Sequence, residues 1–142
     1  MSNKNLIPKI NIPTNTFTNN NTDILGLATK GESADEKNAY IALKYYDRSY
    51  ECISEWNRNE LKELSNKIEL INKLTWSQVK ANSGLRYKDV TDANKLPASK
   101  NKLSDDITFC EIRITEKARI FGFRSNSIFF LCWLDRNHKI CS

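Results

Sequence analysis

Residues Ile107–Ile140 read ITFCEIRITEKARIFGFRSNSIFFLCWLDRNHKI, and they predict a β-sheet. The apolar residues fall into three runs, which are broken near Thr115–Glu116 and at Arg124–Ser127. Runs rich in Ile, Phe and Trp that are separated by short polar breaks are typical of neighbouring antiparallel strands. We therefore expect a three-stranded meander in the C-terminal part of the chain.

The first of these strands is expected to have one solvated face and one buried face, because side chains alternate between the faces of a strand. Glu111 and Arg113 share one face, and the opposite face carries Cys110, Ile112 and Ile114. A polar face of this kind is ordinary on a half-exposed sheet, so the alternation alone does not indicate a site.

Basic residues and the single histidine of the chain follow in the next two strands. Arg119 lies within the second strand, and the end of the third carries Asp135, Arg136, His138 and Lys139. If the strands pair as neighbours, these cations and the imidazole meet at one edge of the sheet. Such a group suits a phosphodiester that is being cut, because cations stabilise negative charge and an imidazole can move a proton. The alternatives are a surface histidine in the last turn and an exposed Asp135–Arg136 turn pair.

The chain upstream predicts one strand and two helices. Tyr40–Tyr46 has the alternation of a first regular strand. The apolar residues of the following helix recur with helical spacing at Leu61, Leu64, Ile68, Ile71 and Leu74. Asn57 with Glu60, and Thr75 with Gln78, have the pattern of a capping box and mark two helix starts. Both helices are expected on the buried face of the sheet.

Two segments are expected outside regular structure. Residues 1–39 predict a flexible arm, with seven Asn among the first 22 residues and room for a short helix over Asp23–Lys30. This arm is either a solvated leader or a segment that docks on the protein itself or on a partner. Leu85–Asp106 predicts a long basic loop with at most a short strand, and it is either a solvated loop or a nucleic-acid clamp.

Composition bounds the class of protein. A chain of 142 residues with 39% hydrophobic residues suits one domain, here residues 40–142 behind the arm. The net charge of +5 comes from residues 80–142, which hold twelve basic and seven acidic side chains, so a nucleic acid or an acidic protein is the expected partner. No apolar run approaches the about 18 residues of a membrane span, and Met1–Lys9 lacks the layout of a signal peptide. We expect a cytoplasmic protein with no membrane partner.

The four cysteines are widely spaced, at Cys52, Cys110, Cys132 and Cys141. They form no C-x-x-C pair, and His138 is the one imidazole in the sequence that could join them around a metal. Buried reduced thiols are therefore expected rather than a zinc site or disulfides.

Four short motifs follow the predicted strand and two helices: Glu111–Ile114 (EIRI), Lys117–Phe123 (KARIFGF), Phe129–Leu134 and Asp135–Ile140 (DRNHKI). Together with the order of elements, they resemble the RelE/ParE superfamily of bacterial toxins. The resemblance covers residues 40–142 and leaves residues 1–39 outside. It implies an α+β fold of order β-α-α-β-β-β, with two helices packed on a small, mainly antiparallel sheet.

The RelE-like branch is the favoured one, and it implies a toxin that cuts messenger RNA on the ribosome and is neutralised by a cognate antitoxin protein. In that branch the 2′-hydroxyl attacks the adjacent phosphorus without a metal or a small-molecule cofactor. Arg119 matches the strand arginine that stabilises the transition state, and His138 matches a C-terminal general acid or base. Glu111 is a weaker candidate for the general base, because it could instead pair with a neighbouring cation.

Further residues are expected to hold the substrate, namely Arg113, Lys117, Arg124, Arg136, Lys139, Tyr87 and Lys88. Many active members end with a functional tyrosine, whereas this chain ends Ile140-Cys141-Ser142, and Tyr87 in the loop is the nearest substitute. The ParE-like branch supplies an alternative function, a non-catalytic inhibitor that binds DNA gyrase or another protein. A nuclease-dead relative that binds only RNA or a partner is the third possibility.

Overall fold

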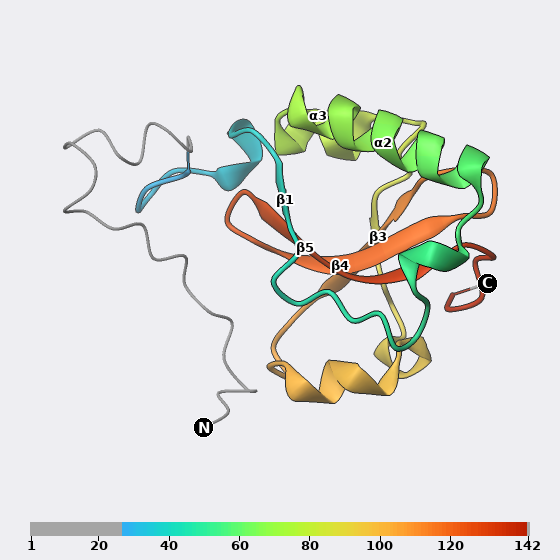
Figure 1. The fold of residues 1–142 in the computed structure, drawn as a ribbon. Coiled ribbons are helices and arrows are strands. Elements are labelled where there is room, and N and C mark those ends of the chain that lie inside the picture. Colours follow the sequence, from blue (N-terminus) through green and yellow to red (C-terminus); the bar gives the residue numbers. More distant parts are fainter. Residues whose placement is uncertain (1–26, 142) are drawn as a thin grey trace, which may run out of the picture.

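The computed structural model describes residues 27–141, which form a five-stranded sheet with helices on one face (Figure 1). The α-helices are α2 (Arg58–Asn72) and α3 (Trp76–Ala81), and the short 3-10 helices are η1 (Ala34–Glu36), η2 (Ile53–Glu55), η3 (Ala93–Lys95) and η4 (Ala98–Lys102). The strands are β1 (Tyr40–Ala42), β2 (Lys88–Asp89), β3 (Phe109–Arg113), β4 (Arg119–Ser125) and β5 (Ile128–Asp135).

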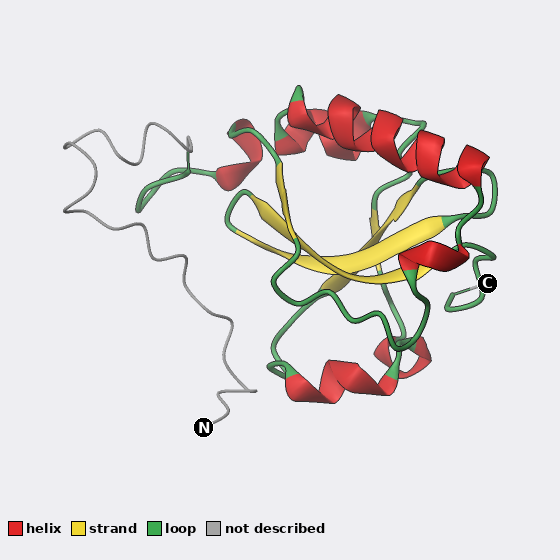
Figure 2. Cartoon of the chain, in the orientation of Figure 1, coloured by secondary structure: helices red, strands yellow, loops and turns green. Residues whose placement is uncertain are grey.

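The sheet has the strand order β1-β5-β4-β3-β2. β1 runs parallel to β5 and all other neighbours are antiparallel, so the predicted C-terminal meander is confirmed. Figure 2 shows α2 and α3 on one side of the sheet and the η4 segment on the other. The α+β class, with two helices packed on a small sheet, is confirmed. Within residues 27–141, no helix has the length and apolar composition needed to cross a membrane.

The predicted first strand differs from the structure in its extent, whereas the predicted loop contains the short strand that the sequence allowed. β1 starts at Tyr40 as expected but ends at Ala42, well before the predicted end of the strand. The loop Leu85–Asp106 contains the two-residue strand β2, in which Lys88 pairs with Glu111 of β3. This short strand forms the outer edge of the sheet beside the predicted catalytic glutamate.

Both helices start where their capping boxes place them. The Asn57 side chain accepts the backbone N–H of Glu60 at 2.8 Å, and the Glu60 side chain accepts that of Asn57 at 2.8 Å. Thr75 and Gln78 form the same reciprocal pair at the start of α3. These side chains satisfy backbone N–H groups that have no partner within a helix, which fixes where each helix begins.

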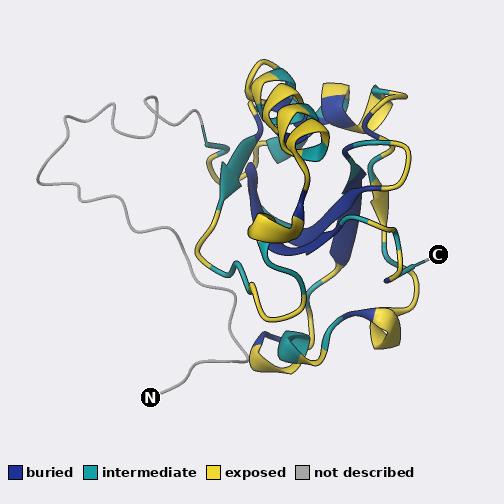
Figure 3. Ribbon diagram, turned by 45° about the vertical axis from the view of Figure 1, so that its right-hand side comes forward, coloured by how far each residue is buried: buried dark blue, intermediate teal, exposed yellow. Residues whose placement is uncertain are grey.

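The three central strands β3, β4 and β5 are largely buried on both faces (Figure 3). Ile112 belongs to the core under α2 and α3, and Phe121 belongs to a second core on the opposite face. The expectation of a solvated face on β3 is wrong, because the Glu111 side of the strand is covered and Glu111 is only 2% exposed. Leu96 and Ile140, from the long loop and the C-terminal tail, help to form this cover.

A bulge interrupts the pairing of β4 with β5. Phe121 pairs with Trp133, but the adjacent Gly122 pairs with Leu131, so one residue of β5 is left over between these pairs. A bulge shifts the alternation of side chains between the two faces. Asp135, which lies beyond the bulge, pairs directly with Arg119 and therefore shares its face of the sheet.

Gly122→Ala should destabilise the fold, because a Cβ at this position would lie inside contact distance of the Phe130 carbonyl oxygen. We expect a loss of about 1–3 kcal/mol in the free energy of unfolding, measured by urea denaturation. Gly84→Ala is the control, since the atom nearest its Cβ would be Oδ1 of the half-buried Asn82 side chain at 3.2 Å and no backbone atom, so it should lose clearly less stability than Gly122→Ala. Equal effects of the two substitutions would show that the close approach is absent.

The segment 27–39 packs on the domain, whereas residues 1–26 of the predicted arm lie outside the described residues. Of the short helix predicted over Asp23–Lys30, the structure describes residues 27–30, and these residues are not helical. The Asp35 carboxylate, in η1, contacts Lys80 Nζ at 2.8 Å and Arg124 Nη1 at 2.9 Å. Asn126 also exchanges two hydrogen bonds with the backbone of Ala28. Residues 27–39 therefore pack on the protein itself, which is one of the alternatives that the sequence left open for the arm.

Acid should loosen η1. Hydrogen bonds from Lys80 first, and then from Arg124, hold the pKa of Asp35 below its ordinary value. Because the pKa of Asp35 is lower in the folded state, its ionised carboxylate stabilises the docked state. This contribution is complete above the ordinary pKa of about 4, and it is lost as the pH falls through the lower pKa of the folded state. In an NMR titration from about pH 5 to about pH 2, the amide signals of Ser33–Lys37 should move toward unstructured values. The same titration of Asp35→Asn should lack this step, and an unchanged step would assign it to another group.

Candidate functional site

Three of the predicted catalytic side chains meet on one face of the sheet. Glu111 comes from β3, Arg119 from β4, and His138 from the turn after β5. Glu111 Oε2 lies 3.5 Å from Arg119 Nε and 3.8 Å from His138 Nε2. Because both nitrogens lie close to one oxygen, Arg119 and His138 are well within the about 10 Å that a shared phosphate allows.

The pairing of the strands explains this meeting. Arg113 pairs with Arg119 across β3 and β4, and Arg119 pairs in turn with Asp135 of β5. Glu111 lies two residues before Arg113 and so points to the same face. The carboxylate and the guanidinium are therefore diagonal neighbours, a separation that long side chains bridge.

Arg119 is buried and tightly held. It is 8% exposed, and its Nη1 donates to the backbone carbonyls of Thr115, Glu116 and Ala118 at 3.0–3.2 Å. Burial lowers the pKa of the guanidinium, and the negative charge of Glu111 acts in the opposite direction. The guanidinium thus binds the β3–β4 turn through Nη1 and points Nε toward the Glu111 carboxylate. Its Nη2 has no hydrogen-bond acceptor within residues 27–141.

Asp135 fixes the turn that carries His138. Its carboxylate accepts the backbone N–H of Lys139 at 2.9 Å and that of Ile140 at 2.7 Å, and its own side chain is buried. His138 has a positive φ of 55°, in the left-handed region that few side chains adopt. A strained residue held by a buried carboxylate keeps the imidazole over Glu111.

Two polar atoms at the centre of the group have no partner. Glu111 Oε1 and His138 Nε2 are buried and make no hydrogen bond within residues 27–141. Buried polar atoms are nearly always paired with protein or with water, so these two atoms leave hydrogen-bonding positions for a water molecule or another polar group. Glu111 also lines a cavity of about 160 Å³, together with Lys88, Asp89, Val90, Thr91, Asp92, Lys95 and Cys141.

This arrangement supplies the parts of an acid–base site. A carboxylate with a free oxygen can accept a proton, an imidazole can donate one, and a fixed guanidinium can stabilise developing negative charge. The separation of 3.8 Å between Glu111 and His138 is longer than a hydrogen bond. The two side chains are therefore close neighbours that are not hydrogen-bonded to each other.

The other predicted cations near this group differ in their surroundings. Lys117 and Lys139 are exposed, and Lys88 is exposed on β2 beside Glu111. Arg113 is half-buried and donates through Nε to the carbonyl of Thr115. The three lysines are therefore free to meet a solvent-borne anion, whereas Arg113 supports the β3–β4 turn.

Arg136 is committed to α2. Its guanidinium makes contacts of 3.0 Å with Glu60, and its backbone N–H donates to Glu51 at 2.8 Å. Burial raises the pKa of Glu51, while hydrogen bonds from Trp56 and Arg136 oppose that shift. Arg136 thus ties the C-terminal turn to the start of the helix.

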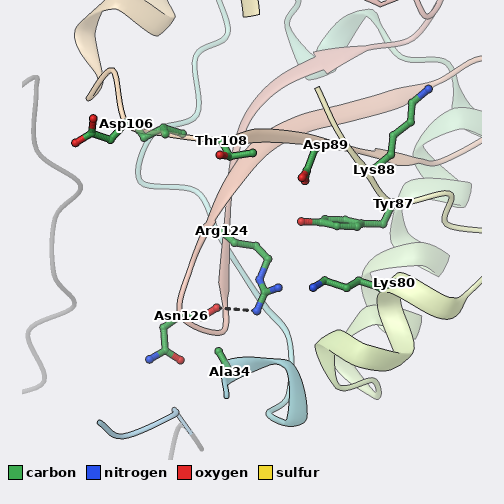
Figure 4. Close-up of a pocket in the computed structure, with 10 residues that line it drawn as sticks. Ala34, Lys80, Tyr87, Lys88, Asp89, Asp106, Thr108, Arg124 and Asn126 are labelled. Atoms are coloured by element: carbon green, nitrogen blue, oxygen red, sulfur yellow. Dashed lines mark hydrogen bonds between the residues drawn. The ribbon is translucent and has the colours of Figure 1, made fainter. Parts of the chain in front are cut away.

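Tyr87 and Arg124 lie in a different place. They line a separate pocket of about 800 Å³ at the other end of β2 and β3, which also includes Lys88 (Figure 4). Burial and the neighbouring Cys110 thiol raise the pKa of Tyr87, so this phenol is a poor substitute for a tyrosine that moves a proton. The structure therefore does not bring Tyr87 and Arg124 to the Glu111 group.

Sequence reasoning missed the role of Asp135. The alternative of an exposed Asp135–Arg136 pair is wrong, since Asp135 is 1% exposed. Its spacing of four and five residues from Lys139 and Ile140 is the available signal, because an Asp at the start of a turn can accept the N–H groups that follow. The expected reduced thiols are found, with Cys110 and Cys132 buried and their pKa values raised by burial to about 12, and Cys52 and Cys141 partly exposed.

Arg119→Ala should destabilise the protein by about 3–5 kcal/mol, because it leaves the buried Glu111 carboxylate without its cation. Arg119→Lys, which retains the charge but cannot bond three carbonyls through one planar head group, should fall between the wild type and Arg119→Ala. Denaturant unfolding measures all three. Lys117→Ala, two residues away and exposed, is the control and should remain within about 0.5 kcal/mol of the wild type. A loss in Arg119→Ala as small as in the control would show that Arg119 and Glu111 are not coupled.

Comparisons with known proteins identify no family for this chain. A scan against protein-family models, a search of curated proteins and a search of solved structures each returned no match. The residues and their geometry are therefore the basis for the function proposed for this chain.

Proposed function

We propose that the protein is a RelE-like endoribonuclease toxin that cuts messenger RNA on the ribosome without a metal. The observation that carries this proposal is the placement of the Glu111 carboxylate between the Arg119 guanidinium and the His138 imidazole. One oxygen and one ring nitrogen of this group are buried without partners, which leaves polar positions for a scissile phosphodiester.

The chemistry assigns one task to each side chain. Glu111 Oε1 accepts the proton of the ribose 2′-hydroxyl as its oxygen attacks the adjacent phosphorus. Arg119 stabilises the extra negative charge on the phosphoryl oxygens through its Nη2, whose protein acceptors are absent among residues 27–141. His138, in its protonated form, gives a proton to the departing 5′-oxygen, and the products are a 2′,3′-cyclic phosphate and a free 5′-hydroxyl.

Glu111 suits the role of base better than the sequence alone indicates. Its carboxylate is anchored by Arg119 through Oε2, so Oε1 remains for the substrate. A carboxylate that is held in place and shielded from water loses no orientation at the moment of reaction. This arrangement supports Glu111 as a catalytic residue and not merely as the partner of a cation.

The surroundings support a polyanionic substrate and an acidic inhibitor. Lys88, Lys117 and Lys139 are exposed around the group, and residues 80–142 hold twelve basic and seven acidic side chains. A positive face of this kind attracts an RNA strand and would be covered by a cognate antitoxin of opposite charge. The ribosome would present the message in an extended form that can enter the site.

One observation favours a second candidate, a non-catalytic protein of the same fold that binds DNA gyrase or another partner. Arg119 is 8% exposed, and its Nη1 donates hydrogen bonds to three backbone carbonyls, as a purely structural arginine would also do. In that case the buried pair would stabilise the sheet, and the exposed cations would contact the partner.

His138→Ala should separate the two functions. We expect cleavage to fall by about 10²–10⁴-fold, because the leaving oxygen loses its proton donor, while the fold is retained since the imidazole is partly exposed. The measurement is the mapping of messenger RNA 5′ ends after induced expression in bacteria.

Asn137→Ala is the matched control, as it alters the exposed neighbour in the same turn and should leave cleavage unchanged. Growth arrest with intact messages, equal in the wild type and His138→Ala, would overturn the nuclease proposal and favour a protein target. Thermal unfolding of both variants checks that neither result reflects loss of the fold.

A further inference from the structure

The larger pocket faces away from the Glu111 group and combines cations with hydrogen-bonding groups. Its volume is about 800 Å³, and it is lined by Ala34, Lys80, Tyr87, Lys88, Asp89, Asp106, Ile107, Thr108, Arg124 and Asn126. Figure 4 shows Lys80 and Arg124 reaching toward each other from α3 and β4. Three of the lining side chains are cations and two are carboxylates. The Asp35 carboxylate contacts two of the cations, so the pocket has an excess of positive charge only when Asp35 is displaced.

Two contacts fix the Arg124 guanidinium in an orientation that can bind an anion. Its guanidinium carbon lies 4.1 Å from the ring centroid of Trp76, and its Nη2 donates to the carbonyl of Asn126 at 3.1 Å. These contacts fix the plane of the head group, because a guanidinium stacks on an aromatic face. Its Nε is buried and has no hydrogen-bond partner within residues 27–141.

The carboxylate of Asp35 occupies this pair of cations. One of its oxygens contacts Arg124 Nη1 at 2.9 Å and the other contacts Lys80 Nζ at 2.8 Å. A phosphodiester offers two non-bridging oxygens with similar spacing and the same charge, so the two cations can hold a phosphate in the way they hold Asp35.

Asp35 is poorly secured compared with the cations that it meets. Its side chain is 36% exposed, and η1 is a three-residue element with no buried residue. The exposed pair with Lys80 contributes little to stability, and an anion that contacts both cations would keep the less exposed Arg124 compensated when it replaces Asp35.

The pocket adjoins the proposed cleavage site across the edge of the sheet. Lys88 and Asp89, which form all of β2, line both the larger pocket and the small cavity at Glu111. A single-stranded nucleic acid that crosses β2 can therefore contact Glu111 on one side of the sheet edge and the Lys80–Arg124 pair on the other.

We propose that Lys80 and Arg124 form a subsite for a phosphodiester of single-stranded nucleic acid, and that Asp35 occupies this subsite in the absence of the strand. The subsite rests on the proposed function, since it binds a phosphate of the same RNA whose adjacent bond is cut at Glu111. Asp35 is thus a displaceable substitute for the substrate phosphate, carried by the chain itself.

The test is the binding of a fluorescent (dT)8 oligonucleotide, measured by anisotropy at several salt concentrations. This probe has no 2′-hydroxyl and cannot be cleaved by the proposed chemistry, so binding is measured apart from cleavage. Asp35→Asn should bind about three- to tenfold more tightly than the wild type at about 0.1 M salt, because two cations are released from a partly exposed carboxylate. The slope of log K against log salt should steepen by about 0.7 for each phosphate that is newly contacted.

Two further variants make the result specific. Glu32→Gln removes the same charge from the same segment but from a residue that pairs with Lys37, so it should change affinity less than about twofold and leave the slope unchanged. Asp35→Asn combined with Lys80→Ala should lose the gain. Lys80 is 43% exposed in its side chain, so this variant avoids the loss of fold that removal of Arg124 from Trp76 could cause.

The outcomes also separate this proposal from the nuclease proposal. Equal binding by Asp35→Asn and Glu32→Gln would overturn the subsite, even if cleavage depends on His138. A gain in Asp35→Asn that requires Lys80 would support the subsite, and if messages nevertheless remain intact in cells, it is the cleavage chemistry that fails.

Discussion

The buried carboxylate of Glu111 imposes the constraint on which the C-terminal sheet depends. A charge that is 2% exposed must be compensated, and the compensation comes from Arg119 on the next strand. Arg119 in turn is held by the carbonyls of the β3–β4 turn, so the ion pair, the turn and the strand register stabilise one another. A shift of one residue in the pairing would move Glu111 to the helix-covered face and leave its charge among apolar side chains.

The bulge in β5 extends this constraint to the C-terminal turn. It places Asp135 on the face that carries Arg119, where the buried carboxylate binds the backbone of Lys139 and Ile140. His138 lies between these contacts and reaches Glu111 as a result. The backbone geometry of β4 and β5 thus determines where the imidazole lies. Gly122 allows the close approach of the two strands at the Phe130 carbonyl.

Local signals in the sequence sufficed for the helix starts and the meander, because capping boxes and alternation act over a few residues. They failed for the solvation of β3, since the cover over Glu111 comes from Leu96 and Ile140, which no short-range pattern connects to the strand. Strand order predicted that Arg119 and His138 lie at one edge of the sheet, whereas the bulge that places Asp135 on the face of Arg119 had no signal in the sequence. The separation of Arg124 from that group was also within reach, because residues five apart on one strand point to opposite faces.

The two groups of cations share one principle and differ in one property. Each contains a carboxylate of the chain itself, Glu111 beside Arg119 and Asp35 beside Arg124. Glu111 is buried, so displacing it would leave two charges uncompensated, and it is better suited to act on a substrate than to yield to one. Asp35 is partly exposed on a short segment, and the proposed exchange for a phosphate would leave its charge in solvent. In the two proposals, burial therefore distinguishes the carboxylate that would accept a proton from the one that a phosphate would replace.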